Sequence, residues 1–209
     1  MITINKILRN NIVLHVCKYE NIEFDEYIPY LNNEEKTKFQ LFNTIKRKSE
    51  FVLVRYIIKT NIGNYTIIYN DLGAPELIDG PFISISHTKS YVVVATSYQR
   101  PVSVDIEGIQ HRLEKLKHKF INTNEEKYID GNNDRLLMLT SFWCAKETLY
   151  KISRMQNLSF LSNLICYPLS ELEYNGIIQT KDRQENHKLY FIHIENYVLC
   201  YTINNNREI

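Results

Sequence analysis

Strand-like and helix-like patterns follow one another twice along this chain, and that order restricts the folds it can adopt. In the first half, an alternating apolar run at 12–16 predicts a strand. The polar residues from Asn32 predict the start of a long helix that continues to about Lys59. Further β-type runs lie at 65–69, 82–85 and 91–96. The first half therefore predicts a strand, a helical stretch and then more strands.

The second half repeats this layout after a break at 99–101. Val102, Val104 and Ile106 alternate with polar residues, which predicts a half-buried strand. Helical patterns follow at 113–120, 124–129 and 134–152, and β-type runs at 189–194 and 197–203. The sequence therefore predicts an α+β fold with two similar lobes in one chain, residues 1–101 and 102–209.

Composition and charge exclude several classes of protein. With 44% hydrophobic and 23% charged residues, a chain of 209 residues can bury a core without disulfide or metal staples. Its 25 Lys and Arg against 24 Asp and Glu give a net charge of +1, so no nucleic-acid partner is expected. The apolar run at 51–54 ends at Arg55, and the first residues lack an export signal. We therefore expect a cytoplasmic protein that does not associate with membranes.

The cysteines support the same compartment. Four of them are spread along the chain without a C-x-x-C pair, namely Cys17, Cys144, Cys166 and Cys200. This spacing is not that of a zinc or redox site. In a reducing compartment we expect these residues to behave as small apolar side chains.

Two carboxylates share one face of the strand predicted at 102–107. Asp105 and Glu107 are two residues apart, so both side chains point to the face opposite Val104 and Ile106. Neighbouring carboxylates repel each other unless they are solvated, protonated or bridged by a cation. The pair is therefore either a solvent-exposed strand face or part of an oxygen-ligand site for Mg²⁺.

A second group of polar residues lies on the helix predicted at 134–152. Trp143, Glu147 and Lys151 are spaced by four and line one stripe of that helix. One interpretation is an ordinary Glu-to-Lys surface pair. The other is a partly buried site, because the tryptophan in the same stripe favours burial of its neighbours.

A polar turn and two basic stretches complete the candidate features. The turn at 84–90 contains hydroxyls and His87, which suit either an anion site or a plain surface hairpin. Residues 34–59 carry seven basic against three acidic residues, and residues 111–119 carry four against one. Such runs are either solvated helix faces or surfaces for phosphates and for an acidic partner.

The order and spacing of these motifs resemble those of the 4'-phosphopantetheinyl transferases of the larger, single-chain type. Members of this family modify carrier proteins of peptide, polyketide and fatty-acid synthesis. The resemblance rests on three segments, F-I-S-I-S-H-T at 82–88, V-S-V-D-I-E at 102–107 and F-W-C-A-K-E-T-L-Y-K at 142–151. It implies two similar α+β lobes with coenzyme A in the cleft between them.

The resemblance implies a transfer reaction that depends on Mg²⁺, with Mn²⁺ as a substitute. The 4'-phosphopantetheine group of coenzyme A moves to a serine of an apo acyl or peptidyl carrier protein, which gives the holo carrier protein and 3',5'-ADP. By similarity, Asp105, Glu107 and Glu147 are the metal ligands. Because one chain supplies both lobes, we expect a monomer.

The same resemblance assigns the remaining site residues. Lys151 would contact phosphate and act in catalysis with Glu147, and Glu125 matches the position of the general base. Glu147 or a metal-bound water is the alternative base. The residues expected to bind coenzyme A, in addition to Lys151, are Lys46, Arg47, Ser86 and His87.

Two other functions remain open for such a chain. One is a carrier-protein-binding module of the same fold without catalytic activity. The other is a metal-dependent phosphoesterase that uses the same carboxylates with water as the nucleophile.

Overall fold

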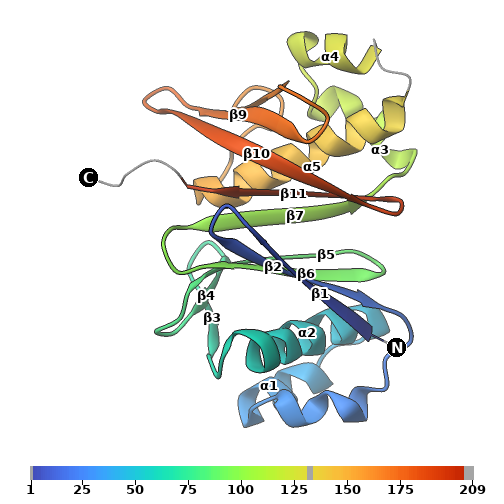
Figure 1. The fold of residues 1–209 in the computed structure, drawn as a ribbon, viewed down its shortest axis with the longest axis vertical. Coiled ribbons are helices and arrows are strands. Elements are labelled where there is room, and N and C mark those ends of the chain that lie inside the picture. Colours follow the sequence, from blue (N-terminus) through green and yellow to red (C-terminus); the bar gives the residue numbers. More distant parts are fainter. Residues whose placement is uncertain (1, 131–133, 205–209) are drawn as a thin grey trace.

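Two antiparallel sheets form the centre of the structure, and helices lie on their outer sides (Figure 1). The computed structural model describes residues 2–130 and 134–204. The first sheet has the order β1 (Ile2–Arg9), β2 (Ile12–Tyr19), β6 (Tyr91–Ser97) and β5 (Phe82–His87). The second has the order β7 (Val102–Gly108), β11 (Tyr197–Ile203), β10 (Gln184–Ile194), β9 (Glu173–Gln179) and β8 (Leu164–Pro168).

The helices divide between the two halves of the chain. The first half contains α1 (Asn33–Gln40) and α2 (Ile45–Ile57), a π-helical turn at Ile58–Ile62 and a small hairpin of β3 (Ile67–Tyr69) and β4 (Pro75–Leu77). The second half contains α3 (Arg112–Leu116), α4 (Thr123–Asp130) and α5 (Arg135–Ser153). Short 3-10 turns lie at Phe24–Glu26, Ile28–Tyr30 and Lys117–Lys119.

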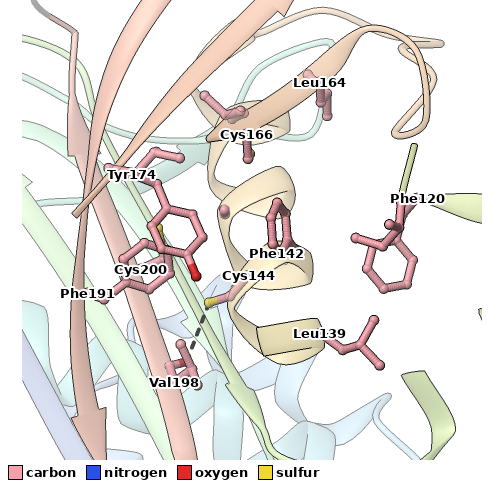
Figure 2. Close-up of a cluster of buried hydrophobic side chains, with 14 of the residues drawn as sticks. Phe120, Leu139, Phe142, Cys144, Leu164, Cys166, Tyr174, Phe191, Val198 and Cys200 are labelled. Atoms are coloured by element: carbon pink, nitrogen blue, oxygen red, sulfur yellow. Dashed lines mark hydrogen bonds between the residues drawn. The ribbon is translucent and has the colours of Figure 1, made fainter. Parts of the chain in front are cut away.

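In the described parts of the chain, apolar side chains form three clusters, and these clusters fix the order of the layers. One cluster joins α2 to the first sheet, and a second joins α5 to the second sheet, where Phe142 lies among Tyr174 and Phe191 (Figure 2). The third lies between the sheets, with Leu14 and Val93 facing Val104. The two sheets are therefore packed against each other by burial of apolar surface.

Helix α5 lies very close to the second sheet. A Cβ atom at Gly176 of β9 would come within 2.8 Å of the Leu149 side chain on α5. The Ser103 hydroxyl on β7 also donates to the carbonyl oxygen of Thr148, at 2.8 Å. These contacts hold α5 directly over β7, the strand that carries Asp105.

The predicted α+β class is confirmed, as are the strand at 102–107 and the helix at 134–152. The single long helix expected from Asn32 to Lys59 is wrong, because residues 41–44 separate two helices and the Thr44 side chain caps the second. Strand β1 was not predicted. Its signal is the pair Asn10 and Asn11, both with positive φ, which suits the tight turn before β2. The division into lobes at residue 101 stays a prediction.

Two further expectations concern membranes and cysteines. Within residues 2–130 and 134–204, no helix has both the length and the apolar character required to cross a bilayer. The four cysteines are free and buried. Their expected behaviour as small apolar side chains is therefore confirmed.

The buried histidine of the first sheet predicts a loss of stability in acid. His15 on β2 is 1% exposed, and burial, assisted by the charge of Lys6, lowers its pKa from 6.5 to about 4. Between these values the unfolded chain binds more protons than the folded one, so stability falls as the pH drops through this window. The contribution of neutral His15 to the free energy of unfolding, roughly 3 kcal/mol, is fully present above pH 6.5. Urea unfolding from pH 7 to 4 should show a flatter profile for His15→Leu, and parallel profiles would contradict the assignment.

Candidate active site

The two sheets meet at β5 and β7, and side chains connect these strands. The amide of Val104 donates to the Ser84 hydroxyl at 3.1 Å, and the amide of Ile106 donates to the Ser86 hydroxyl at 3.2 Å. Both serines lie on β5 and both amides on β7. Serine hydroxyls therefore occupy the positions that backbone carbonyls hold in a regular ladder.

Asp105 lies at this junction and is buried, with 4% exposure. Its Oδ1 atom accepts hydrogen bonds from Ser86 Oγ and Lys151 Nζ, both at 2.8 Å. Its Oδ2 atom is buried and has no hydrogen-bond partner within the described residues. The nearby Cys144 thiol donates instead to the carbonyl oxygen of Val198 (Figure 2). The solvent-exposed strand face considered from the sequence is therefore wrong for Asp105.

Lys151 on α5 supplies a fixed positive charge. Besides Asp105, its ammonium contacts the carbonyl oxygens of Val104 at 3.0 Å and Ile85 at 3.5 Å. Burial would lower the pKa of Lys151, but the charge and hydrogen bond of Asp105, assisted by Glu147, raise it above the usual value. Lys151 is therefore charged at neutral pH, and its ion pair is with Asp105.

Glu107 and Glu147 complete a group of three carboxylates. Glu107 accepts a hydrogen bond from the Trp143 indole at 3.2 Å and pairs with Arg112 at 3.4 Å. Burial and then the charge of Asp105 raise the pKa of Glu107. For Glu147, burial and the charges of Asp105 and Glu107 raise the pKa to about 7, although Lys151 opposes the shift. The three carboxylates are therefore close enough to repel one another.

A second cluster surrounds Glu50 on α2. This buried carboxylate pairs with His87 Nδ1 at 3.0 Å, with Arg47 at 3.2 Å and with Lys46 at 3.8 Å. Burial alone would raise the pKa of Glu50, but hydrogen bonds and charges from these residues lower it. A cleft of about 610 Å³ joins this cluster to the carboxylates, because Lys46, His87, Glu107 and Arg112 all line it.

The three carboxylates offer oxygen ligands for a divalent cation. No group of three or more His, Cys, Asp or Glu side chains in the described parts of the chain is already arranged to hold an ion. However, within the described residues Asp105 Oδ2 lacks a hydrogen-bond partner. Burial, and then the charge of Asp105, raise the pKa values of Glu107 and Glu147. Oxygen ligands of this kind suit Mg²⁺. The donor set therefore fits a divalent cation if the carboxylates converge when it binds.

The structure does not bring Glu125 to this group. Glu125 is fully buried in the C-terminal half, where its Oε2 atom pairs with Lys146 at 2.7 Å and accepts from the Asn122 amide. Its Oε1 atom accepts from the Cys166 amide. Both oxygens are therefore occupied, which opposes the expected role of Glu125 as the base. The hydroxyl of Ser86, a residue expected to bind coenzyme A, donates to Asp105 at 2.8 Å.

Sequence reasoning missed two residues of structural importance. Lys146 binds Glu125 and the carbonyl oxygens of Phe120 and Phe160, so one ammonium joins three segments. Glu50 is the shared partner of the basic side chains in the second cluster. Its position three and four residues after Arg47 and Lys46 is the signal that could have identified it.

Loss of Lys146 should destabilise the fold strongly. Lys146→Ala would leave Glu125 buried without its cation, which typically costs about 3–5 kcal/mol in the free energy of unfolding. Urea unfolding would measure the loss, with the exposed Lys115→Ala as the matched control. Equal stability of the two variants would show that the buried pair contributes nothing.

Comparison with known proteins agrees with this geometry. The family model of the 4'-phosphopantetheinyl transferase superfamily matches residues 101–202. No curated protein matches the chain. The matched segment contains Asp105, Glu107, Glu147 and Lys151. Residues 101–202 are therefore a domain of the 4'-phosphopantetheinyl transferase superfamily.

Proposed function

We propose that this protein transfers 4'-phosphopantetheine from coenzyme A to a serine of an apo acyl or peptidyl carrier protein. The observation that carries the proposal is the proximity of three carboxylates to one another and to Lys151, inside the segment that matches the transferase family. In this reaction the serine oxygen bonds to the phosphorus that bears pantetheine. The bond from that phosphorus to the departing phosphate breaks, and its electrons leave with 3',5'-ADP.

Asp105, Glu107 and Glu147 would hold Mg²⁺, with Mn²⁺ as a substitute, and Asp105 would offer its unpaired Oδ2 atom. The bound ion would supply positive charge to the diphosphate oxygens. All of these ligands come from one chain, so the activity needs no second subunit. We place the activity in the cytoplasm, as expected from the sequence.

The side chains of this protein would supply the remaining catalytic roles, which are charge stabilisation and proton transfer. Lys151 stays charged because its pKa is raised, so it stabilises the negative charge that develops on the leaving diphosphate. Glu147, which lies beside Lys151 and Asp105, would accept the proton of the attacking serine. Glu125 has no part in this step, because both of its oxygens are bound inside the fold.

The basic side chains around Glu50 form the proposed coenzyme A phosphate site. Lys46, Arg47 and His87 lie beside the carboxylates and their side chains are partly exposed. A second cavity of about 260 Å³ lies at the other end of the junction and is lined by Ala74, Pro75, Tyr150, Lys151 and Arg154. Its apolar walls and the Arg154 side chain suit the nucleotide end of coenzyme A.

The carrier protein would approach the basic surface beside Glu107. Lys115 and Lys119 are exposed there, whereas Lys117 pairs with Glu126. Positive charge on this surface would speed the encounter with an acidic partner more than it would tighten the complex. The basic surface therefore supports an acidic carrier protein as the second substrate.

Incubation with coenzyme A, Mg²⁺ and an apo carrier protein tests the proposal by mass spectrometry. We expect the carrier to gain phosphopantetheine, the gain to stop in excess chelator, and Asp105→Asn to abolish it, with thermal unfolding as the check that this variant folds. Hydrolysed coenzyme A without transfer would identify a phosphoesterase. A stable complex without chemistry would identify a binding module.

Substitutions at Lys151 and at His87 should affect different kinetic constants, kcat for Lys151 and the KM for coenzyme A for His87. Lys151→Ala removes a positioned charge, so kcat should fall about 10²–10³-fold while the affinity for coenzyme A changes little. His87→Ala should mainly raise the KM for coenzyme A. Thermal unfolding of both variants would confirm that they fold. A near-parent kcat and KM for Lys151→Ala would contradict the assignment.

A further inference from the structure

Asp105 uses its two carboxylate oxygens differently. Oδ1 accepts both of the hydrogen bonds that the structure gives this side chain, from Ser86 and from Lys151. Among the residues that the structure describes, Oδ2 has no hydrogen-bond partner, and it is buried. A buried charged oxygen without a donor is costly, so an unpaired carboxylate oxygen in this position calls for a ligand.

We propose that Ser86 is a positioning residue, which holds Asp105 so that Oδ2 faces the divalent cation. Its hydroxyl has one proton to donate, and that proton goes to Asp105 Oδ1 at 2.8 Å. The hydroxyl also accepts from the Ile106 amide at 3.2 Å, which limits its rotation. Ser86 is 6% exposed, so water has little access to compete for these bonds.

The two donors to Oδ1 come from different elements. Ser86 lies on β5 of the first sheet, and Lys151 lies on the last turn of α5. Because the two donors are on separate elements, rotation of the carboxylate would break at least one of these bonds. Side chains that hydrogen-bond to a metal ligand fix its orientation in this manner, and their loss typically costs 10–100-fold in metal affinity.

Ser84 offers a matched control two residues earlier on the same strand. It is also 6% exposed, and its hydroxyl accepts from the Val104 amide at 3.1 Å. Within the described residues, the Ser84 hydroxyl is bonded to the β7 backbone and not to Asp105. Ser84→Ala therefore removes a similar connection between the sheets without removing a donor to the carboxylate.

Binding of Mn²⁺, followed by the electron paramagnetic resonance signal of the free ion, tests the inference without any substrate. We expect Ser86→Ala to weaken Mn²⁺ binding by about 10-fold or more, and Ser84→Ala to change it by less than about twofold. Thermal unfolding of both variants would show that their losses of stability are alike. The pair Ser86→Thr and Ser86→Val gives a second comparison, because these side chains have similar shapes and Thr alone keeps the hydroxyl. Ser86→Thr should bind Mn²⁺ more tightly than Ser86→Val.

The inference rests on the proposed metal-dependent function. A further variant, Asp105→Asn, shows whether a negative result counts against the metal site or only against the role of Ser86. If the parent protein binds Mn²⁺ and Asp105→Asn does not, the metal site stands. Equal affinities of Ser86→Ala and Ser84→Ala, or of the Thr and Val variants, would then overturn the role of Ser86 alone. If the parent and Asp105→Asn bind Mn²⁺ equally, the metal site and the role of Ser86 both fail.

Discussion

Hydrogen bonds to the Asp105 carboxylate join the elements on which the candidate site depends. Ser86 reaches this carboxylate from β5 and Lys151 from α5, while Asp105 itself lies on β7. The Lys151 ammonium also contacts backbone carbonyls of both strands. Because β5 and β7 belong to different sheets, their relative position at the site depends on these side-chain bonds together with the apolar cluster between the sheets. A substitution that removes the Asp105 carboxylate therefore also removes hydrogen bonds at the contact between the two sheets.

Basic side chains are in excess on one side of this junction, and carboxylates are in excess on the other. Around Glu50, three basic side chains surround one carboxylate, and the pKa of that carboxylate is lowered. Around Asp105, three carboxylates share Lys151 and the more distant Arg112, and the pKa values of Glu107 and Glu147 are raised. Perturbed groups that gather in a cleft are typical of functional sites. A phosphate ester that carries a divalent cation would complement both clusters at once, which coenzyme A with Mg²⁺ would do in the proposed reaction.

The sequence predicts those parts of the site that depend on local periodicity. Alternation along β7 separates Asp105 from Val104 and Ile106, and the structure shows the valine and isoleucine in the apolar cluster between the sheets. The contact between Ser86 and Asp105 could not be predicted in this way, because it depends on how two sheets pack. The same limit applies to Glu125, whose partner Lys146 lies 21 residues away in the sequence. A residue that matches a family motif can thus have its polar atoms bonded within the fold, as both carboxylate oxygens of Glu125 are.

Helical geometry explains why neighbouring residues of α5 have such different surroundings. Successive residues of an α-helix point about 100° apart, whereas residues four apart lie nearly on one line. Trp143, Glu147 and Lys151 therefore share the stripe that faces β7, where the first hydrogen-bonds to Glu107 and the last to Asp105. Lys146 points away from this stripe, toward Glu125 and the carbonyl oxygens of Phe120 and Phe160. A buried ammonium there anchors the helix to the surrounding loops, and the rigid helix in turn carries Glu147 and Lys151 to the junction of the sheets. The spacing of the motif thus separates one lysine that secures the helix from another that faces the reacting groups in the proposed mechanism.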